Sequence, residues 1–349
     1  MTLPTTMKAW VVTRSGLHLR TDAPVPTIAP AGHDILIKVT HVALNPVDLH
    51  LINNIPSWLP LRRNPTPAAD FAGEVVAAGS AVKDLAIGAR VCGALPLGRF
   101  LNGRGSLAEF IAVPADLVAV QPERLSPGQA AGVMGIAGQT SFIMAAAAEG
   151  LGSGQRVLVN GASGGVGSIL VQVLKGKGAE VVGVCSGANE AMVKGLGADE
   201  VVDYRTHAPL EGYLAERFPL VANGKEEEGK RPLDFIFDCA GSQVLFSQSP
   251  KYMRPEGKFI SIVGGASQGV VPWLRNRVPT FLGGTPRTFQ LLLLLPSGKT
   301  AREAAELVNK GVIKEAPIDS EFAFEEADKA FERLGTKHAK GKVIVKVAA

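Results

Sequence analysis

The sequence contains few cysteines, and their positions match no metal site or disulfide framework. Only Cys92, Cys185 and Cys239 occur in 349 residues, and they lie far apart in the chain. Zinc sites place their cysteine or histidine ligands in closely spaced pairs, and disulfide frameworks use even sets of cysteines. We therefore expect no metal ligands, no disulfide framework and a reducing compartment.

The sequence also lacks a strong excess of charge of one sign. It has 36 lysines and arginines against 32 acidic residues, which gives a net charge of +4, and its densest charged run, GKEEEGKR at 224–231, mixes both signs. Nucleic-acid-binding domains cluster basic residues on one face. We therefore expect no nucleic-acid partner.

No long hydrophobic run is present. The most apolar stretch, FQLLLLLP at 289–296, is far too short to cross a bilayer as a helix, so we expect no membrane span and interpret the stretch as a buried strand or helix. The first residues, MTLPTTMKAWVVT, do not follow the basic-then-apolar order of a signal peptide. A cytoplasmic location is the expectation.

The chain is long enough for two domains, and its pattern changes near Ser126. Before this point, short apolar runs alternate with turn signals, which predicts a β-rich, barrel-like unit. The segment 126–150 predicts a helix, with Ser126 as N-cap and Pro127 at the first helical position.

Strands and helices alternate in the middle of the chain, which predicts an α/β fold with a doubly wound parallel sheet of the Rossmann type. We expect helices near 300–310 and 325–334 and a last strand near 342–347. The expected strands of the parallel sheet are 156–160, 180–185, 200–203, 234–238 and 258–263.

A glycine-rich turn follows the first of these strands, in the sequence NGASGGVG. Ala162, Gly164 and Gly167 have the spacing A-x-G-x-x-G, a variant of the dinucleotide fingerprint, and they lie between a strand and a helix. Glycine lets the backbone approach a pyrophosphate, and the helix N-terminus favours an anion. The turn predicts a dinucleotide site, and the alternative is a tight turn without a ligand.

The end of the second strand indicates which dinucleotide binds. NAD sites usually place an acidic residue there to bind the ribose 2′-hydroxyl, but this chain has Ser186. Nothing at that position would repel a 2′-phosphate, and Ser186, Asn189 and Tyr204 are polar. The pattern favours NADPH over NADH, and the alternative is that these residues only cap turns.

Eight short motifs occur in an order that resembles a known family. They are VALNPVDLH (42–50), ADFAGEVVAAGSAV (69–82), GSLAEFIAVPADLV (105–118), GIAGQTSF (135–142), NGASGGVG (160–167), LGADEVVDYR (196–205), FDCAGS (237–242) and HAKGKVIVKV (338–347). The chain is similar over nearly its whole length to medium-chain dehydrogenases/reductases, specifically the zinc-free quinone oxidoreductase (zeta-crystallin-like) and fungal enone reductase branch.

The resemblance implies a divided catalytic domain. Residues 1–128 and 290–349 would form a GroES-like catalytic domain, and residues 129–289 would form an inserted Rossmann NADPH-binding domain. It also implies a homodimer, in which VVPWL (270–274) could extend the parallel sheet across a two-fold axis.

The resemblance also implies the site residues. It places Asn45 and Asp48 of the N-P-x-D motif in the substrate cleft, with Asp48 as an orienting group because an unperturbed aspartate is ionised at neutral pH. The implied cofactor-binding residues are Asn45, Thr140, Ser163, Gly164, Gly165, Val166, Ser186, Asn189, Tyr204, Val263 and Leu282. Some relatives carry an arginine between the serine and the asparagine, where this chain has Ala188.

His50 lies where relatives often carry a tyrosine or lysine. A histidine can donate a proton near neutral pH, so His50 is a candidate proton donor. The alternative is a histidine that only forms a hydrogen bond at the cleft edge or faces solvent. Trp58, Leu59 and Leu61 are candidates for an apolar wall of the substrate cleft.

The expected reaction needs no metal. Zinc dehydrogenases have a cysteine near Asn45 and a histidine in the segment that here is AADFAGEV, and neither is present. We expect an NADPH-dependent enzyme that transfers hydride to an activated C=C bond or to a quinone, with a small apolar carbonyl compound or quinone as substrate. The alternatives are a trans-acting enoyl reductase of a polyketide pathway and a non-catalytic NADPH-binding sensor or structural protein.

Overall fold

The computed structural model describes residues 3–13, 15–54, 64–96, 98–99, 102–220, 230–263, 276 and 278–348. The chain divides into two compact units: Met1–Gln139 with Leu294–Ala349, and Thr140–Leu293. The C-terminal segment therefore belongs to the same unit as the N-terminal part of the chain. The divisions lie at 139/140 and 293/294, where the sequence analysis expected 128/129 and 289/290.

The first unit is built mainly from antiparallel strands. Its strands are β1 (Thr6–Thr13), β2 (Gly16–Pro24), β3 (Asp34–Leu44), β4 (Asp70–Ala78), β5 (Arg90–Ala94), β6 (Phe110–Pro114), β7 (Val118–Val120), β14 (Ile318–Ala323) and β15 (Lys342–Lys346). Among the described residues, β1 pairs with β2, and the others form a seven-stranded sheet in the order β14-β15-β3-β4-β5-β7, with β6 on β3. Ile35, Ile37 and Val39 alternate along β3 and are fully buried in the core of this unit.

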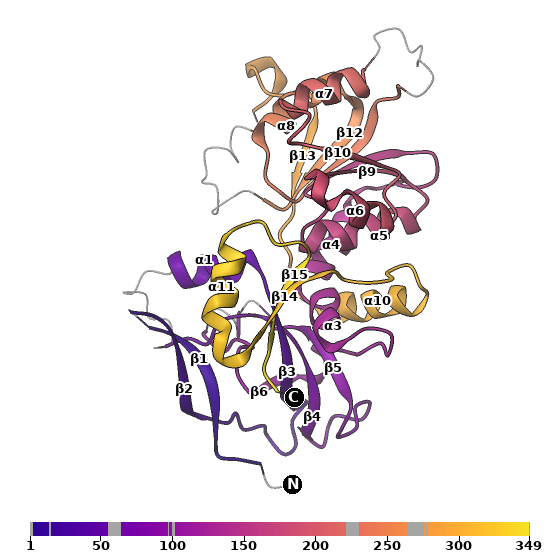
Figure 1. Ribbon diagram of the computed structural model, residues 1–349. Helices are drawn as coiled ribbons and strands as arrows, with labels where there is room; N and C mark the ends of the chain where they lie inside the picture. The colour runs from indigo at the N-terminus through magenta and orange to yellow at the C-terminus, as the bar shows by residue number, and fades with distance from the viewer. Residues whose placement is uncertain are drawn as a thin grey trace. The chain divides into compact units, whose positions relative to one another are not determined.

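Helices cover parts of this sheet. They are α1 (Pro46–Asn54), α3 (Pro127–Met134), α10 (Gly298–Asn309) and α11 (Ala327–Gly335), with short 3-10 turns η1 (Ala115–Leu117) and η6 (Phe324–Glu326). Helix α11 packs against α1, β14 and β15 (Figure 1). The predicted start of α3 is confirmed, because Ser126 is the N-cap, forms a capping box with Gln129, and precedes Pro127.

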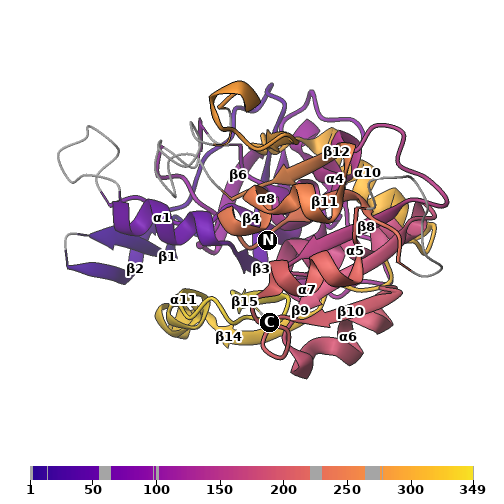
Figure 2. The same cartoon turned by 90° about the horizontal axis from the view of Figure 1, so that it is seen from above.

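The second unit contains a parallel sheet. Its strands are β8 (Arg156–Asn160), β9 (Glu180–Cys185), β10 (Glu200–Asp203), β11 (Leu233–Asp238), β12 (Met253–Ser261) and β13 (Thr288–Leu291), in the order β10-β9-β8-β11-β12-β13 among the described residues. Figure 2 shows β8, β9 and β10 side by side, with α6 beside β10. The predicted doubly wound α/β fold is confirmed.

The helices of the second unit alternate with its strands. They are α4 (Ile136–Ala147), which contains the unit boundary, α5 (Gly165–Gly176), α6 (Glu190–Gly195), α7 (Leu210–Arg217) and α8 (Gln243–Ser247), with 3-10 turns η2 (Gly187–Asn189), η3 (Ser249–Lys251) and η5 (Thr280–Leu282). The single helix predicted over 126–150 is wrong, because α3 and α4 are separated at Gly135. A Cβ atom at Gly135 would lie 2.4 Å from Cγ of Asp70, so only glycine fits beside that carboxylate.

The apolar stretch 289–296 differs from its prediction. Only its start lies in a strand, β13, while Leu293 and Leu295 are 80% and 68% exposed. The interpretation of this stretch as a buried strand or helix is therefore wrong for its second half. Among the described residues no single helix is long and apolar enough to cross a membrane, although α3 and α4, as a bent pair, pass the same test by length and composition.

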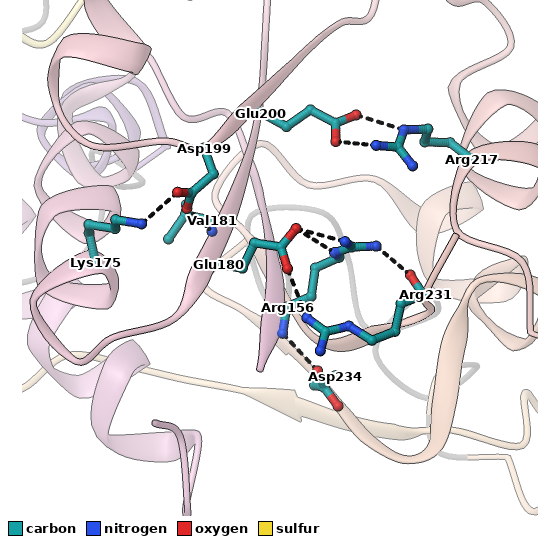
Figure 3. Close-up of polar contacts among 9 residues, drawn as sticks. All are labelled: Arg156, Lys175, Glu180, Val181, Asp199, Glu200, Arg217, Arg231 and Asp234. Atoms are coloured by element: carbon teal, nitrogen blue, oxygen red, sulfur yellow. Dashed lines mark hydrogen bonds and ion pairs between the residues drawn. The ribbon is translucent and has the colours of Figure 1, made fainter. Parts of the chain in front are cut away.

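Ion pairs connect the amino ends of neighbouring strands in the parallel sheet. Glu180, at the start of β9, accepts hydrogen bonds from Arg156 at the start of β8 and from Arg231, both at 2.8 Å (Figure 3). Arg217 of α7 pairs with Glu200 at 2.8 Å. Charge-assisted bonds of this kind are stronger than neutral ones, and here they connect neighbouring strands at the edge opposite the glycine turn.

Candidate functional site

The glycine-rich turn joins β8 to α5 in the second unit. Gly161 has a positive φ of 81°, which side chains rarely allow. The backbone N–H groups of Gly161 and Ala162 both donate to the carbonyl of Val184, at 3.1 and 3.0 Å. The turn is therefore fixed against β9, and Gly161 is the glycine that its backbone conformation requires.

Helix α5 begins directly at this turn. Gly164 is its N-cap and offers no side chain to cap the first helical N–H groups. A Cβ atom at Gly167 would lie 2.2 Å from the carbonyl oxygen of Gly161, so the first turn of the helix is packed tightly against the loop. Together, the uncapped N–H groups and the close packing form a cradle suited to a pyrophosphate.

Ser163 and Asn189 connect this turn with the end of β9. The Asn189 side-chain amide donates to Oγ of Ser163 at 3.1 Å. Asn189 is only 8% exposed, and its Oδ1 atom is buried with no hydrogen-bond partner among the described residues. Buried polar atoms are rarely left unpaired, so this amide indicates a site that a ligand completes.

The residues at the ends of β9 and β10 lie at the same edge of the sheet. Ser186 caps η2 and is partly exposed, and Tyr204 is 42% exposed. The backbone N–H of Tyr204 donates to the carbonyl of Cys185 at 3.2 Å. The structure thus brings together Ser163, Gly164, Gly165, Val166, Ser186, Asn189 and Tyr204 at the carboxyl ends of β8, β9 and β10.

The other predicted cofactor-binding residues lie elsewhere. Thr140 is buried in α4, and Leu282 is 66% exposed in η5. Val263 follows β12, and its backbone N–H and carbonyl both bond Oγ of Ser261, at 3.1 and 3.0 Å. Asn45 belongs to the first unit.

Asp238 was not identified from the sequence, although it organises the loop after β11. Its carboxylate accepts hydrogen bonds from the Asn160 side chain at 2.8 Å, from the backbone of Ala240 and Gly241 at 3.1 and 2.9 Å, and from Ser242 at 2.9 Å. A Cβ atom on Gly161 would lie 3.4 Å from Cβ of Ala240, so this loop borders the glycine turn. The signal in the sequence is that Asn160 and Asp238 both end strands of a parallel sheet.

In the first unit, the N-P-x-D motif starts helix α1. Pro46 is the first helical residue, and the Asp48 carboxylate accepts a hydrogen bond from the backbone N–H of Asn45 at 2.7 Å. This is half of a capping box, with proline at its preferred place. The motif is therefore a helix start.

The Asn45 side chain is bound inside the protein. Its Oδ1 accepts a hydrogen bond from Nζ of Lys342 at 2.6 Å, and its Nδ2 donates to Oδ2 of Asp70 at 2.8 Å. Asp70 also accepts the backbone N–H of Ile136, the first residue of α4, at 2.7 Å. Both ends of the Asn45 amide are therefore occupied, and the side chain holds its loop to β4 and β15.

Burial changes the protonation of this cluster. Asp48 and Asp70 are fully buried, and Lys342 is 4% exposed. Burial and the nearby Asp70 carboxylate raise the pKa of Asp48 to about 8. Burial also raises the pKa of Asp70 and lowers the pKa of Lys342. This direction opposes the expectation that Asp48 is ionised at neutral pH, because burial favours the uncharged acid.

His50 lies on α1, two residues after Asp48, and is exposed. Residues two apart on a helix point to different sides, because each residue turns the helix by about 100°. This explains why Asp48 is buried and His50 reaches solvent. The predicted apolar wall of Trp58, Leu59 and Leu61 lies outside the described residues.

Comparisons with known proteins identify both parts of the chain. Residues 31–123 match the family model of the alcohol dehydrogenase GroES-like domain, and residues 196–345 match the zinc-binding dehydrogenase model. The chain is 34% identical to the medium chain reductase pydE of Acremonium sp over 99% of this chain and all of that protein. It is 30% identical to the trans-enoyl reductase poxH of Penicillium oxalicum over 99% of both chains.

A solved structure gives the same result. The quinone oxidoreductase of Coxiella burnetii has a TM-score of 0.76 and 27% sequence identity, over 98% of this chain and 99% of that one. The whole-length similarity matches the two-unit architecture and the glycine turn described above. The chain therefore belongs to the medium-chain dehydrogenase/reductase family of oxidoreductases, in the branch that contains quinone oxidoreductases and enoyl reductases.

Proposed function

We propose that this protein is an NADPH-dependent reductase that transfers hydride to the activated C=C bond of an enone or enal, or to a quinone. The observation that carries the proposal is the cradle between β8 and α5, where glycine N–H groups and the incomplete Asn189 amide lie at one sheet edge. The names of the relatives, which include a medium chain reductase, a trans-enoyl reductase and a quinone oxidoreductase, support the reaction class.

The choice of NADPH rests on the residue that ends β9. Ser186 stands where an acidic residue would bind a ribose 2′-hydroxyl and repel a 2′-phosphate. The Ser186 hydroxyl is able to donate a hydrogen bond to a phosphate, whereas the open atom of Asn189 is Oδ1, which would accept a hydrogen bond from a ligand hydroxyl or amino group. Gly164, Gly165 and Val166 hold the pyrophosphate in this proposal, and Thr140, Val263 and Leu282 are assigned to the nicotinamide end.

When bound, the cofactor would supply the hydride. The residues of this chain bind and orient the cofactor and the substrate, and one of them donates a proton to the reduced substrate. His50 is the proposed proton donor, because it is exposed on α1 and a histidine side chain exchanges protons near neutral pH. Asn45 and Asp48 fix the start of α1, which sets the position of His50. The substrate is a small apolar carbonyl compound or quinone.

The proposed reaction uses no zinc, although the family model is named for zinc-binding dehydrogenases. The buried groups near the N-P-x-D motif are Asn45, Asp48 and Asp70, and the Lys342 ammonium already lies among them, 2.6 Å from Asn45. A second cation there would face electrostatic repulsion from that ammonium. Across the described residues, no three histidine, cysteine or acidic side chains gather as a metal site would require.

The domain limits, assembly and location are also part of the proposal. We assign residues 1–128 and 290–349 to the catalytic domain and 129–289 to the NADPH-binding domain. A homodimer in the cytoplasm follows from the family resemblance, with the sheet edge at β13 as the candidate dimer contact. The segment 270–274, which was expected to extend the sheet, lies outside the described residues.

A trans-acting enoyl reductase is the second candidate, favoured by the likeness to poxH. Steady-state oxidation of NADPH over a panel of enones, quinones and enoyl thioesters separates the candidates. The proposed function predicts turnover of free enones or quinones. Turnover of enoyl thioesters alone would favour the second candidate, and no turnover with any acceptor, despite NADPH binding, would favour a sensor or structural protein.

A further inference from the structure

An arginine, Arg205, lies in the segment after β10, at the sheet edge where the 2′-phosphate is proposed to bind. Strands β9 and β10 are parallel, and Cys185 at the end of β9 pairs with Asp203 at the end of β10. Ser186 follows the first strand, and Tyr204 and Arg205 follow the second. In folds of this type, the adenosine half of a dinucleotide binds at this edge of the sheet.

Arg205 is exposed and is not engaged by a carboxylate within the described part of the chain. Its guanidinium carbon lies over the Tyr204 ring, 5.8 Å from the ring centroid. Only its backbone N–H bonds an acidic group, Oδ1 of Asp203, at 2.9 Å. The aromatic ring supports the guanidinium and leaves its N–H groups available for an anion.

The other described arginines of the second unit are already engaged. Arg156, Arg217 and Arg231 pair with glutamates, as Figure 3 shows. Arg254 pairs with Asp234, and Arg287 donates to the carbonyl of Met253. Arg205 therefore differs from these arginines, because its guanidinium neither pairs with a carboxylate nor donates to a carbonyl among the described residues.

The incomplete Asn189 amide is an independent sign of a ligand at this edge. Asn189 lies in η2, between Ser186 and α6, and its Oδ1, a hydrogen-bond acceptor, is buried with no partner in the described part of the chain. A carboxylate is also close, because a Cβ atom at Gly187 would lie 2.5 Å from Oδ2 of Asp203. Asp203 would favour the ribose 2′-hydroxyl of NADH, and Arg205 would favour the 2′-phosphate of NADPH. The two side chains therefore favour different cofactors.

We propose that Arg205 is the specificity-determining residue that binds the 2′-phosphate of NADPH, in place of the arginine that is absent at Ala188. The proposal rests on the proposed function as an NADPH-dependent enzyme. A guanidinium presents a fork of N–H donors that matches phosphate geometry, and the cation–π contact with Tyr204 leaves these donors open to a ligand. Asp203 holds the loop through the backbone of Arg205.

Titration calorimetry on the full-length protein tests this proposal. The probes are NADPH and NADH, together with adenosine 2′,5′-bisphosphate and adenosine 5′-monophosphate, which separate the adenosine end from the nicotinamide. We expect Arg205→Ala to raise the Kd of NADPH and of the bisphosphate about tenfold to a hundredfold. The Kd values of Arg205→Lys should lie between those of the wild type and those of Arg205→Ala. The Kd values of NADH and the monophosphate should change less than about twofold, which also shows that the variant is folded.

Lys177→Ala is the matched control for the loss of one positive charge. Lys177 is exposed at the C-terminal end of α5, and the helix of 12 residues places it about 18 Å from Gly165. Its removal should leave all four Kd values within about twofold of the wild type. An equal loss of NADPH affinity in this variant would show a general charge effect and overturn the proposal.

Two results would overturn the proposal in different ways. If the wild type prefers NADPH and Arg205→Ala keeps that preference, Arg205 is not the determinant, while the proposed function stands. If the wild type binds NADH as tightly as NADPH, both the cofactor assignment and the role of Arg205 fail. A loss of NADH affinity in Asp203→Asn would then identify Asp203 as the selecting residue.

Discussion

The ammonium of Lys342 lies 2.6 Å from Oδ1 of Asn45, a residue 297 positions away in the sequence. The same ammonium donates to the carbonyl of Leu44 at 2.8 Å and lies 3.5 Å from Oδ2 of Asp70. One lysine of the C-terminal segment thus holds the start of α1 to β4. Its strand, β15, pairs with β3, so the end of the chain belongs to the same unit as the N-terminal part.

Removal of this ammonium should destabilise the first unit. Lys342→Met leaves the buried Asp70 carboxylate without its cation, and breaking a buried pair in this way costs about 3–5 kcal/mol. Chemical denaturation followed by far-UV circular dichroism measures the loss. The double variant Lys342→Met/Asp70→Asn should lose less unfolding free energy than the two single variants lose together. A loss in the double variant as large as that sum, or larger, would contradict the pairing.

Asp48 should make stability depend on pH. Its ordinary pKa is 3.8 and its pKa in the fold is about 8, so between these values the folded state keeps a proton that the unfolded state has released. The free energy of unfolding therefore falls as pH rises through this range and changes no further above it. Asp48→Asn removes this contribution, while Asp70 and Lys342 remain in both proteins.

As the pH rises from about 4 to about 8, the Asp48→Asn variant should consequently gain stability relative to the wild type, as measured by thermal unfolding. An asparagine matches the shape of the uncharged acid, so the start of α1 should persist. A stability difference that stays constant over this pH range would show that Asp48 is ionised in the fold.

Ser186→Asp should shift the cofactor preference toward NADH. A carboxylate at the end of β9 would repel the 2′-phosphate and accept a hydrogen bond from the 2′-hydroxyl. Titration calorimetry should show a higher Kd for NADPH and a lower one for NADH. Ser186→Ala is the matched control, because it removes the hydroxyl without adding charge, and it should not favour NADH.

His50→Phe should lower kcat and kcat/KM together. The proposed proton donor acts in the transition state, and general acid catalysis contributes about a hundredfold to ten-thousandfold. His50 is exposed in the first unit, so the Kd of NADPH should stay nearly unchanged. A variant that keeps more than about half of the wild-type kcat would show that water or another residue supplies the proton.

The sequence predicted the local features of the second unit well. The bounds of β8, β9 and β10 agree with the expected strands because each has valine-rich residues at its centre and is bordered by glycine or polar residues. Strand β12 begins at Met253, five residues before the expected start at 258, because Pro255 and Gly257 obscure its first half. Local sequence patterns were thus sufficient to predict the bounds of β8, β9 and β10, but not the start of β12.

Contacts between distant residues could not be read from the sequence. The pairing of Lys342 with Asn45, and of Asp238 with Asn160, depends on which strands become neighbours. The break between α3 and α4 depends on the Asp70 side chain, which occupies the space beside Gly135. Arg205 was missed because only the pairing of β9 with β10 brings the segment after Asp203 to the same sheet edge as Ser186.

Transfer of a labelled hydride would show whether this protein reduces an activated C=C bond with NADPH and without zinc. The protein would be incubated with NADPH that carries deuterium at the transferring position of the nicotinamide, together with an enone that the substrate panel identifies. We expect a saturated ketone with one deuterium at the β-carbon, detected by mass spectrometry and NMR, and with undiminished yield after chelator treatment. A product without deuterium, or a reaction that stops when zinc is removed and resumes when it is restored, would contradict zinc-independent hydride transfer from NADPH.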